Sequence, residues 1–173
     1  IEGTITNIAF VKNELFPYAR QQMASFVAEH AGEPAVAEQL QAVANELDRE
    51  VTDHDAIVAQ LIEWIDSDVK ATPLKTLQGM IWNAAYVSGD IKGHLYDEVV
   101  DQLQAWKDMG LSLYVYSSGS VAAQKLLFGY SVAGDVTPLF NGYFDTRIGH
   151  KIERASYEAI ATEIDTDAAH ILF

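Results

Sequence analysis

The stretch LYVYSSGSVAAQKLLF, residues 113–128, decides the class of fold. Its first four residues, Leu113–Tyr116, are β-prone, and Val121–Phe128 has the pattern of a helix. Only the small residues Ser117–Ser120 separate the two segments. A strand that runs almost directly into a helix is typical of α/β proteins, whose strands pair in parallel through right-handed crossovers. We therefore predict an α/β fold.

The segments after this stretch continue the alternation. GYFDTRI, residues 142–148, predicts a brief strand, and AAHILF, residues 168–173, indicates a buried strand. Residues 156–164 predict a helix between them, with Tyr157, Ile160, Ala161 and Ile164 on one face. The C-terminal part is thus expected to hold strands and helices in turn.

The segments before this stretch are helical. Residues 15–106 carry apolar side chains at a period of 3.6, in several groups. The first predicted helix has Phe16, Ala19, Met23, Phe26 and Val27 on its apolar face and Pro17 in its first turn, and a weaker helix is predicted over Ala35–Leu47. The third is capped by Thr52 and buries Val58, Leu61, Ile62 and Ile65. The last two bury Leu74, Leu77, Ile81 and Ala85, ending near Gly89, and Val99, Val100, Leu103 and Trp106, ending at Gly110.

The composition indicates a folded chain. The 173 residues are enough for one domain or for a core with an inserted subdomain, and 49% hydrophobic residues supply a sizeable interior. No apolar run approaches the ~18 residues of a membrane span, so we expect no membrane association and a cytoplasmic location. The absence of cysteine excludes disulfides, thiolate metal sites and a cysteine nucleophile.

The net charge of −14 restricts the partners. Eleven Lys and Arg residues against 25 Asp and Glu residues do not form the basic surface that binds nucleic acid. An anionic substrate would need a local positive centre, such as a divalent cation, a lysine or the amides of a helix start.

Three segments offer such chemistry at the strand ends. Ser117 and Ser118 follow a strand and precede a helix, where hydroxyls and free N–H groups bind phosphate, although an ordinary helix cap is the alternative. Lys151 follows the second strand and is expected at a helix start, from which it would reach the same edge as Ser117, although a solvated surface lysine is the alternative. Its neighbour His150 favours a structural role. Glu2, followed by Gly-Thr, is expected two residues past a strand end, where it would shuttle protons, although an exposed loop acid is the alternative. All three would meet at one edge of the sheet, as an active site requires.

These motifs resemble a known family. IEGT, FVKNELFPYAR, LKTLQGMIW, VYSSGSVAAQKLLFGYS and GYFDTRIGHK are similar to segments of the enolase-phosphatases of methionine salvage, within the haloacid-dehalogenase-like superfamily. The resemblance implies a Rossmann-like parallel sheet core made of residues 1–9 and 97–173, with a helical cap, residues 10–96, inserted after the first motif. It also implies that the first and last core strands are truncated in this chain.

The resemblance further implies a reaction and its residues. A 2,3-diketo-5-methylthiopentyl 1-phosphate would be enolised and then dephosphorylated to the acireductone by a monomeric, magnesium-dependent phosphoric monoester hydrolase. The nucleophilic aspartate is expected before Ile1, and Mg²⁺ would be held by it, by the Glu2 carbonyl and by an aspartate after Phe173. By the same resemblance, Glu2 would act as general acid and base, and Lys151 would be catalytic. The phosphate would be bound by Ser117, Ser118, Gly119 and Lys151. Trp82 and Tyr86 would either line an apolar pocket in the cap or pack among the cap helices.

Two alternatives remain open. The same fold also suits a phosphatase or phosphomutase that acts on another small phosphate ester. A catalytically dead, helix-rich binding module is the other alternative, which the acidic surface and the lack of the expected nucleophile among residues 1–173 favour.

Overall fold

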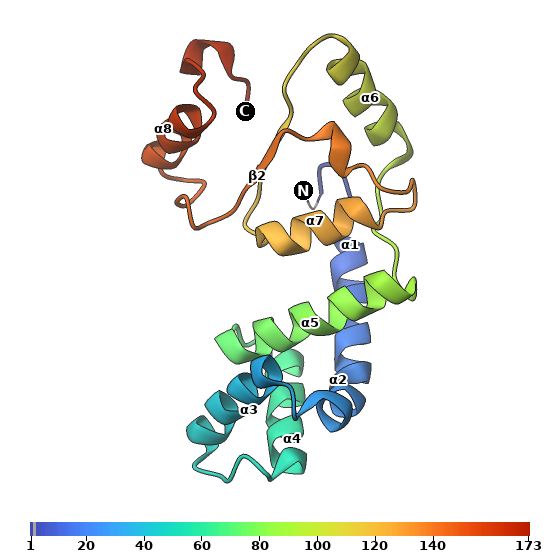
Figure 1. The fold of residues 1–173 in the computed structure, drawn as a ribbon, viewed down its shortest axis with the longest axis vertical. Helices are drawn as coiled ribbons and strands as arrows, with labels where there is room; N and C mark the ends of the chain where they lie inside the picture. The colour runs from blue at the N-terminus through green and yellow to red at the C-terminus, as the bar shows by residue number, and fades with distance from the viewer. Residues whose placement is uncertain (2) are drawn as a thin grey trace. The chain divides into compact units, whose positions relative to one another are not determined.

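A computed structural model describes residue 1 and residues 3–173, so the predictions made for Glu2 lie outside the described residues. The chain divides into two units, one made of Ile1–Asn7 with Lys92–Phe173 and the other of Ile8–Ile91 (Figure 1). No helix in the described part of the chain has both the length and the apolar character to cross a membrane.

The unit of residues 8–91 is entirely helical, as the 3.6-residue period predicts. Its elements are α1 (Ile8–Phe10), the π-helix η1 (Val11–Leu15), α2 (Phe16–His30), α3 (Pro34–Leu47), α4 (His54–Asp66) and α5 (Thr72–Ser88). Its core is formed by one apolar stripe from each of the longer helices, with Met23, Leu40, Leu61 and Leu77 all at most 1% exposed. The α5 helix ends at Ser88, and Gly89 follows as its C-cap with φ of 85°, which confirms the predicted end near Gly89.

Two helix starts in this unit differ from the prediction. Helical backbone begins at Ile8 rather than Leu15, and the π-turn η1 precedes Pro17, whose ring nitrogen has no N–H to donate to a preceding turn. Asp53, not Thr52, caps α4, because its Oδ1 accepts a 3.2 Å hydrogen bond from the Ala56 N–H.

The second unit holds the strands. Its elements are α6 (Asp97–Asp108), β1 (Tyr114–Tyr116), α7 (Val121–Gly129), the 3-10 turn η2 (Thr137–Leu139), β2 (Gly142–Phe144), α8 (Arg154–Glu163) and the 3-10 turn η3 (Ala168–His170). β1 and β2 pair in parallel with Val115 opposite Tyr143, and α7 lies between them in the chain (Figure 1). The predicted α/β class and the parallel pairing are confirmed.

A small hydrophobic core packs around these strands. Leu95, Val115, Phe128 and Val136 form its buried centre, and the ring of Phe140 packs 4.6 Å from that of Phe128. These contacts join the start of α6, strand β1 and helix α7, so β1 is packed against both helices.

Two predictions for this unit are wrong. The second strand ends at Phe144 instead of residue 148, because the Asp145 carboxylate accepts from the Arg147 N–H and turns the chain. Residues 168–173 form no strand; Asp167 Oδ1 accepts from the Ala169 N–H and starts η3, and Leu172 is 99% exposed. A strand needs a paired neighbour, and residues 171–173 pair with neither β1 nor β2.

Candidate active site

The loop after β1 is fixed by its own serines. Ser117 is 1% exposed, and its N–H donates to the Phe144 carbonyl at 3.1 Å, which extends the pairing of β1 and β2 by one bond. The Ser117 Oγ accepts from the Gly119 N–H at 3.3 Å, while Ser118 is exposed. Ser120 caps α7, because its Oγ accepts from the Ala123 N–H at 3.2 Å. The cap is therefore Ser120, and the hydroxyls of Ser117 and Ser118 have no capping role.

A buried amide ties this loop to the second strand. Gln124 is 2% exposed, and its Nε2 donates to the Gly119 carbonyl at 2.8 Å and to the Phe144 carbonyl at 2.9 Å. One side chain on α7 thus bridges the residues that follow β1 and the last residue of β2. The Gln124 side chain therefore links the carboxyl ends of the two strands.

Asp145, which sequence reasoning missed, lies at the same edge. It is 6% exposed, its Oδ2 accepts from the Val121 N–H at 3.1 Å, and the Arg147 Nε donates to both its oxygens at 3.0 and 3.1 Å. The hydrogen bond from Arg147 lowers the pKa of this carboxyl to about 2, although burial acts in the opposite direction. A signal for this residue was available in its place in the chain: Asp145 directly follows β2, as Ser117 directly follows β1, and residues at such strand ends meet at one edge of the sheet.

Lys151 lies in the loop between β2 and α8. The helix begins at Arg154 after a Glu153 cap, so the expected position of Lys151 at a helix start is wrong by three residues. Its side chain is exposed, and Nζ lies 5.8 Å from the ring centroid of Tyr116, the residue before Ser117. The structure therefore brings Lys151 beside the strand that leads into Ser117.

The other predicted residues lie elsewhere. His150 is exposed, and its carbonyl accepts from the Ser156 hydroxyl at 2.8 Å, a structural contact. In the helical unit, the Trp82 Nε1 donates to the Leu15 carbonyl at 2.8 Å, and Tyr86 is 3% exposed. Burial, and secondarily the charge of Glu14, raises the pKa of the Tyr86 hydroxyl.

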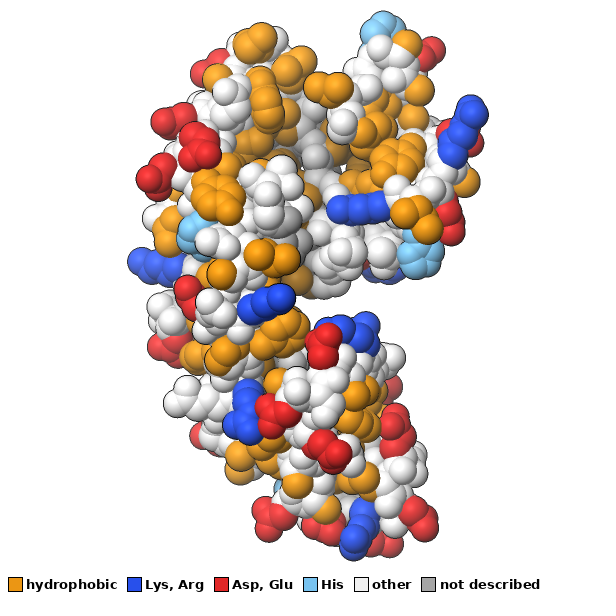
Figure 2. All heavy atoms as spheres, turned by 180° about the vertical axis from the view of Figure 1, so that it is seen from behind, with side chains coloured by type: hydrophobic (Ala, Val, Ile, Leu, Met, Phe, Trp, Pro, Cys, Tyr) orange, Lys and Arg blue, Asp and Glu red, His pale blue; other side chains and the backbone are white. Residues whose placement is uncertain are grey.

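The charges on the surface are mixed. Figure 2 shows Asp and Glu side chains scattered over the visible face, with Lys and Arg side chains between them. Among residues 1 and 3–173, no three His, Asp or Glu side chains gather into a group that could hold a metal ion. The buried carboxylate nearest the edge, Asp145, is already occupied by Arg147 and two backbone N–H groups. The described residues therefore do not by themselves fit a magnesium site.

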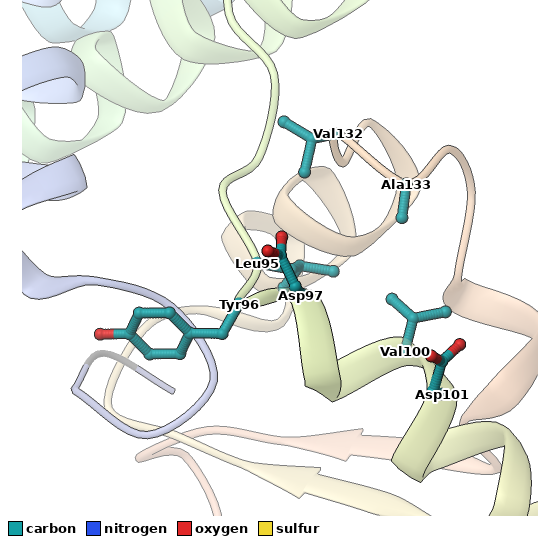
Figure 3. Close-up of a pocket in the computed structure, with 7 residues that line it drawn as sticks. All are labelled: Leu95, Tyr96, Asp97, Val100, Asp101, Val132 and Ala133. Carbon is teal, nitrogen blue, oxygen red and sulfur yellow. The ribbon is translucent and has the colours of Figure 1, made fainter.

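A pocket is lined by other residues of the same unit. Figure 3 shows its lining at the start of α6 and in the turn after α7. The lining residues are Leu95, Tyr96, Asp97, Val100, Asp101, Val132 and Ala133. None of the predicted phosphate-binding residues belongs to it.

Comparison with known proteins identifies relatives of the whole chain, although no protein-family model matches. Proteins called Enolase-phosphatase E1 from Hahella chejuensis, Serratia proteamaculans and Pseudomonas aeruginosa are 53%, 54% and 55% identical over all 173 residues, which span 74%, 76% and 77% of their lengths. The crystal structure of the UTR4 protein from Saccharomyces cerevisiae matches all of this chain and 77% of its own, with a TM-score of 0.80 and 35% identity. These matches confirm the resemblance, and the chain belongs to the enolase-phosphatase family.

Proposed function

We propose that this protein enolises 2,3-diketo-5-methylthiopentyl 1-phosphate and then releases its phosphate, giving the acireductone of methionine salvage. Enolisation moves a proton from carbon to oxygen, and hydrolysis replaces the ester P–O bond with a bond to water. The observation that carries this proposal is the identity of about 53% with enolase-phosphatases along the whole chain. It also supports the coarser statement that the protein is a phosphatase that acts on a small phosphorylated molecule.

Ser117, Ser118 and Gly119 are proposed to bind the phosphoryl oxygens. The Ser117 Oγ already accepts from the Gly119 N–H, so the hydroxyl proton remains to be donated to an anion. The bonds of Gln124 to Gly119 and Phe144 support a loop that is ordered before the substrate binds, and the Gly119 N–H would exchange the Ser117 Oγ for a phosphoryl oxygen on binding.

Lys151 is proposed to neutralise charge on the transferring phosphoryl group. A protein with a net charge of −14 repels a phosphate ester at long range, and an ammonium at the site offsets this repulsion locally. The position of Lys151 Nζ over Tyr116, next to Ser117 in the chain, supports this role.

The remaining assignments also stay proposals. Residues 10–96 would act as a cap that excludes water, with Trp82 and Tyr86 near the methylthio group. Glu2 would exchange protons with the leaving oxygen and the attacking water, and its carbonyl would provide one ligand for Mg²⁺. The described residues supply no complete magnesium site. We expect the protein to act as a monomer in the cytoplasm.

The test is a coupled assay on the purified protein, which follows phosphate release together with the enediol absorbance. Lys151→Ala should lower kcat/KM by about 10²–10³-fold, as does the loss of one donor to a developing charge. The matched control is Lys125→Ala, since the Lys125 Nζ also lies over a tyrosine ring, that of Tyr143 at 5.7 Å. Phosphate release without enediol would favour a plain phosphatase. A wild type that releases no phosphate would favour the binding module.

A further inference from the structure

The loop that carries Lys151 is held by hydroxyl groups. Three consecutive carbonyls each accept one side-chain hydroxyl at a short distance, and the donors come from β1 and from α8. The bonds are Tyr116 Oη to Gly149 O at 2.7 Å, Ser156 Oγ to His150 O at 2.8 Å and Tyr157 Oη to Lys151 O at 2.6 Å. Such a loop has three anchors over three residues, although its side chains are exposed.

Gly149 allows the middle anchor to form. Its φ of 135° lies in the region that favours glycine, and a Cβ at this position would meet the Ser156 Oγ. Ser156 itself is 1% exposed, so its hydroxyl has little freedom to move aside. The absence of a side chain at Gly149 therefore lets the α8 hydroxyl reach the His150 carbonyl.

Tyr116 connects this loop with the phosphate-binding loop. It is the last residue of β1, directly before Ser117, and it both donates to Gly149 O and places its ring beneath Lys151 Nζ. Its ring also packs edge-on against that of Tyr157 at 5.6 Å. A lysine side chain has many rotamers, so a fixed backbone and an aromatic face both limit where its ammonium lies.

We propose that Tyr116, Ser156 and Tyr157 are positioning residues that hold the Lys151 ammonium at the carboxyl end of β1. The three hydroxyls act on Lys151 through its backbone, and the Tyr116 ring acts on its side chain. Any catalytic consequence rests on the proposed function, in which Lys151 faces the phosphoryl group.

The first experiment measures loop order without reference to activity. Hydrogen exchange is followed at the Gly149 and Glu153 amides, which donate to Thr146 O and His150 O inside this loop. Tyr116→Phe and Tyr157→Phe should each raise the exchange rates there by about tenfold, since local opening is governed by such contacts. The control is Tyr114→Phe, on the same strand, where the ring packs 6.2 Å from Phe144. Unchanged exchange in both variants, with an unaltered circular dichroism spectrum, would overturn the proposal.

The second experiment is a double-mutant cycle on phosphate release. Tyr116→Phe should lower kcat/KM by about 10- to 100-fold in the wild-type background, as for a misplaced catalytic group, and should have no effect once Lys151 is alanine. Equal losses in both backgrounds would mean that Tyr116 does not act through Lys151, and would overturn the positioning role. A wild type without activity would refute the proposed function alone, because the exchange experiment still decides whether the hydroxyls order the loop.

Discussion

Replacement of Asp145 by asparagine tests how the carboxyl edge of the sheet is held together. Asp145 accepts from the N–H groups of Val121 and Arg147 and from the Arg147 Nε, and its side chain is 7% exposed. Asparagine keeps the shape but has one acceptor oxygen instead of two. Whichever way its amide is turned, one of the two backbone N–H groups faces an NH₂ group and loses its bond.

The magnitude follows from the proton affinity of the carboxyl. A pKa that falls from 3.8 to about 2 on folding corresponds to about 2.4 kcal/mol of stabilisation of the charged form. The Arg147 side chain is 80% exposed, so solvent screens part of this interaction. A backbone N–H left without an acceptor costs about 1–3 kcal/mol. The loss of the charge and the loss of a backbone acceptor concern the same hydrogen bonds, so the two costs are not added. We expect the free energy of unfolding at pH 7 to fall by about 2–3 kcal/mol.

The pH dependence gives the decisive sign. The folded-state pKa is depressed, so the contribution of Asp145 is complete above its unfolded pKa, near 4, and is lost as the pH falls toward 2. The difference in unfolding free energy between the wild type and Asp145→Asn should therefore shrink steadily from pH 5 to pH 2. Urea unfolding followed by circular dichroism at pH 7, 5, 4 and 3 measures it, with the exposed Asp101→Asn as control. A difference that is the same at pH 7 and pH 3 would refute the reasoning.

Two further substitutions, each with a control variant, test one close contact and one hydrogen bond. Gly93→Ala should lower the free energy of unfolding in urea by about 1–3 kcal/mol, because a Cβ at this position would meet the Leu127 carbonyl. In the control Gly79→Ala the Cβ meets open space, so the free energy of unfolding should stay unchanged or rise by up to about 1 kcal/mol. Trp82→Phe removes the indole N–H that donates to a carbonyl of η1, and should cost about 1 kcal/mol more than Trp64→Phe; equal losses would exclude a role for that bond.

Much of the helical architecture was encoded locally. The apolar residues of α2, α4 and α5 recur at 3.6-residue spacing, and every backbone bond of a helix joins residues close together in the chain. The strand–loop–helix pattern of residues 113–128 likewise predicted β1 and α7 correctly, and GYFDTRI predicted the parallel strand β2, although this strand ends at Phe144. One failure depended on a pairing partner: residues 168–173 have the composition of a strand but pair with neither β1 nor β2.

The candidate site was decided by contacts that no spacing reveals. The motif SSGS predicts Ser117 at the end of a strand, which the structure confirms, because the motif lies directly between β1 and α7. That Asp145 accepts from Val121, that Gln124 bridges Gly119 and Phe144, and that Tyr116 anchors Gly149 became evident only from the tertiary structure. The physical reason is that a hydroxyl, amide or carboxylate can bond any backbone group within reach. Only the folded chain determines which of these groups, 20 to 33 residues away for Phe144 and Gly149, actually lies within 3 Å.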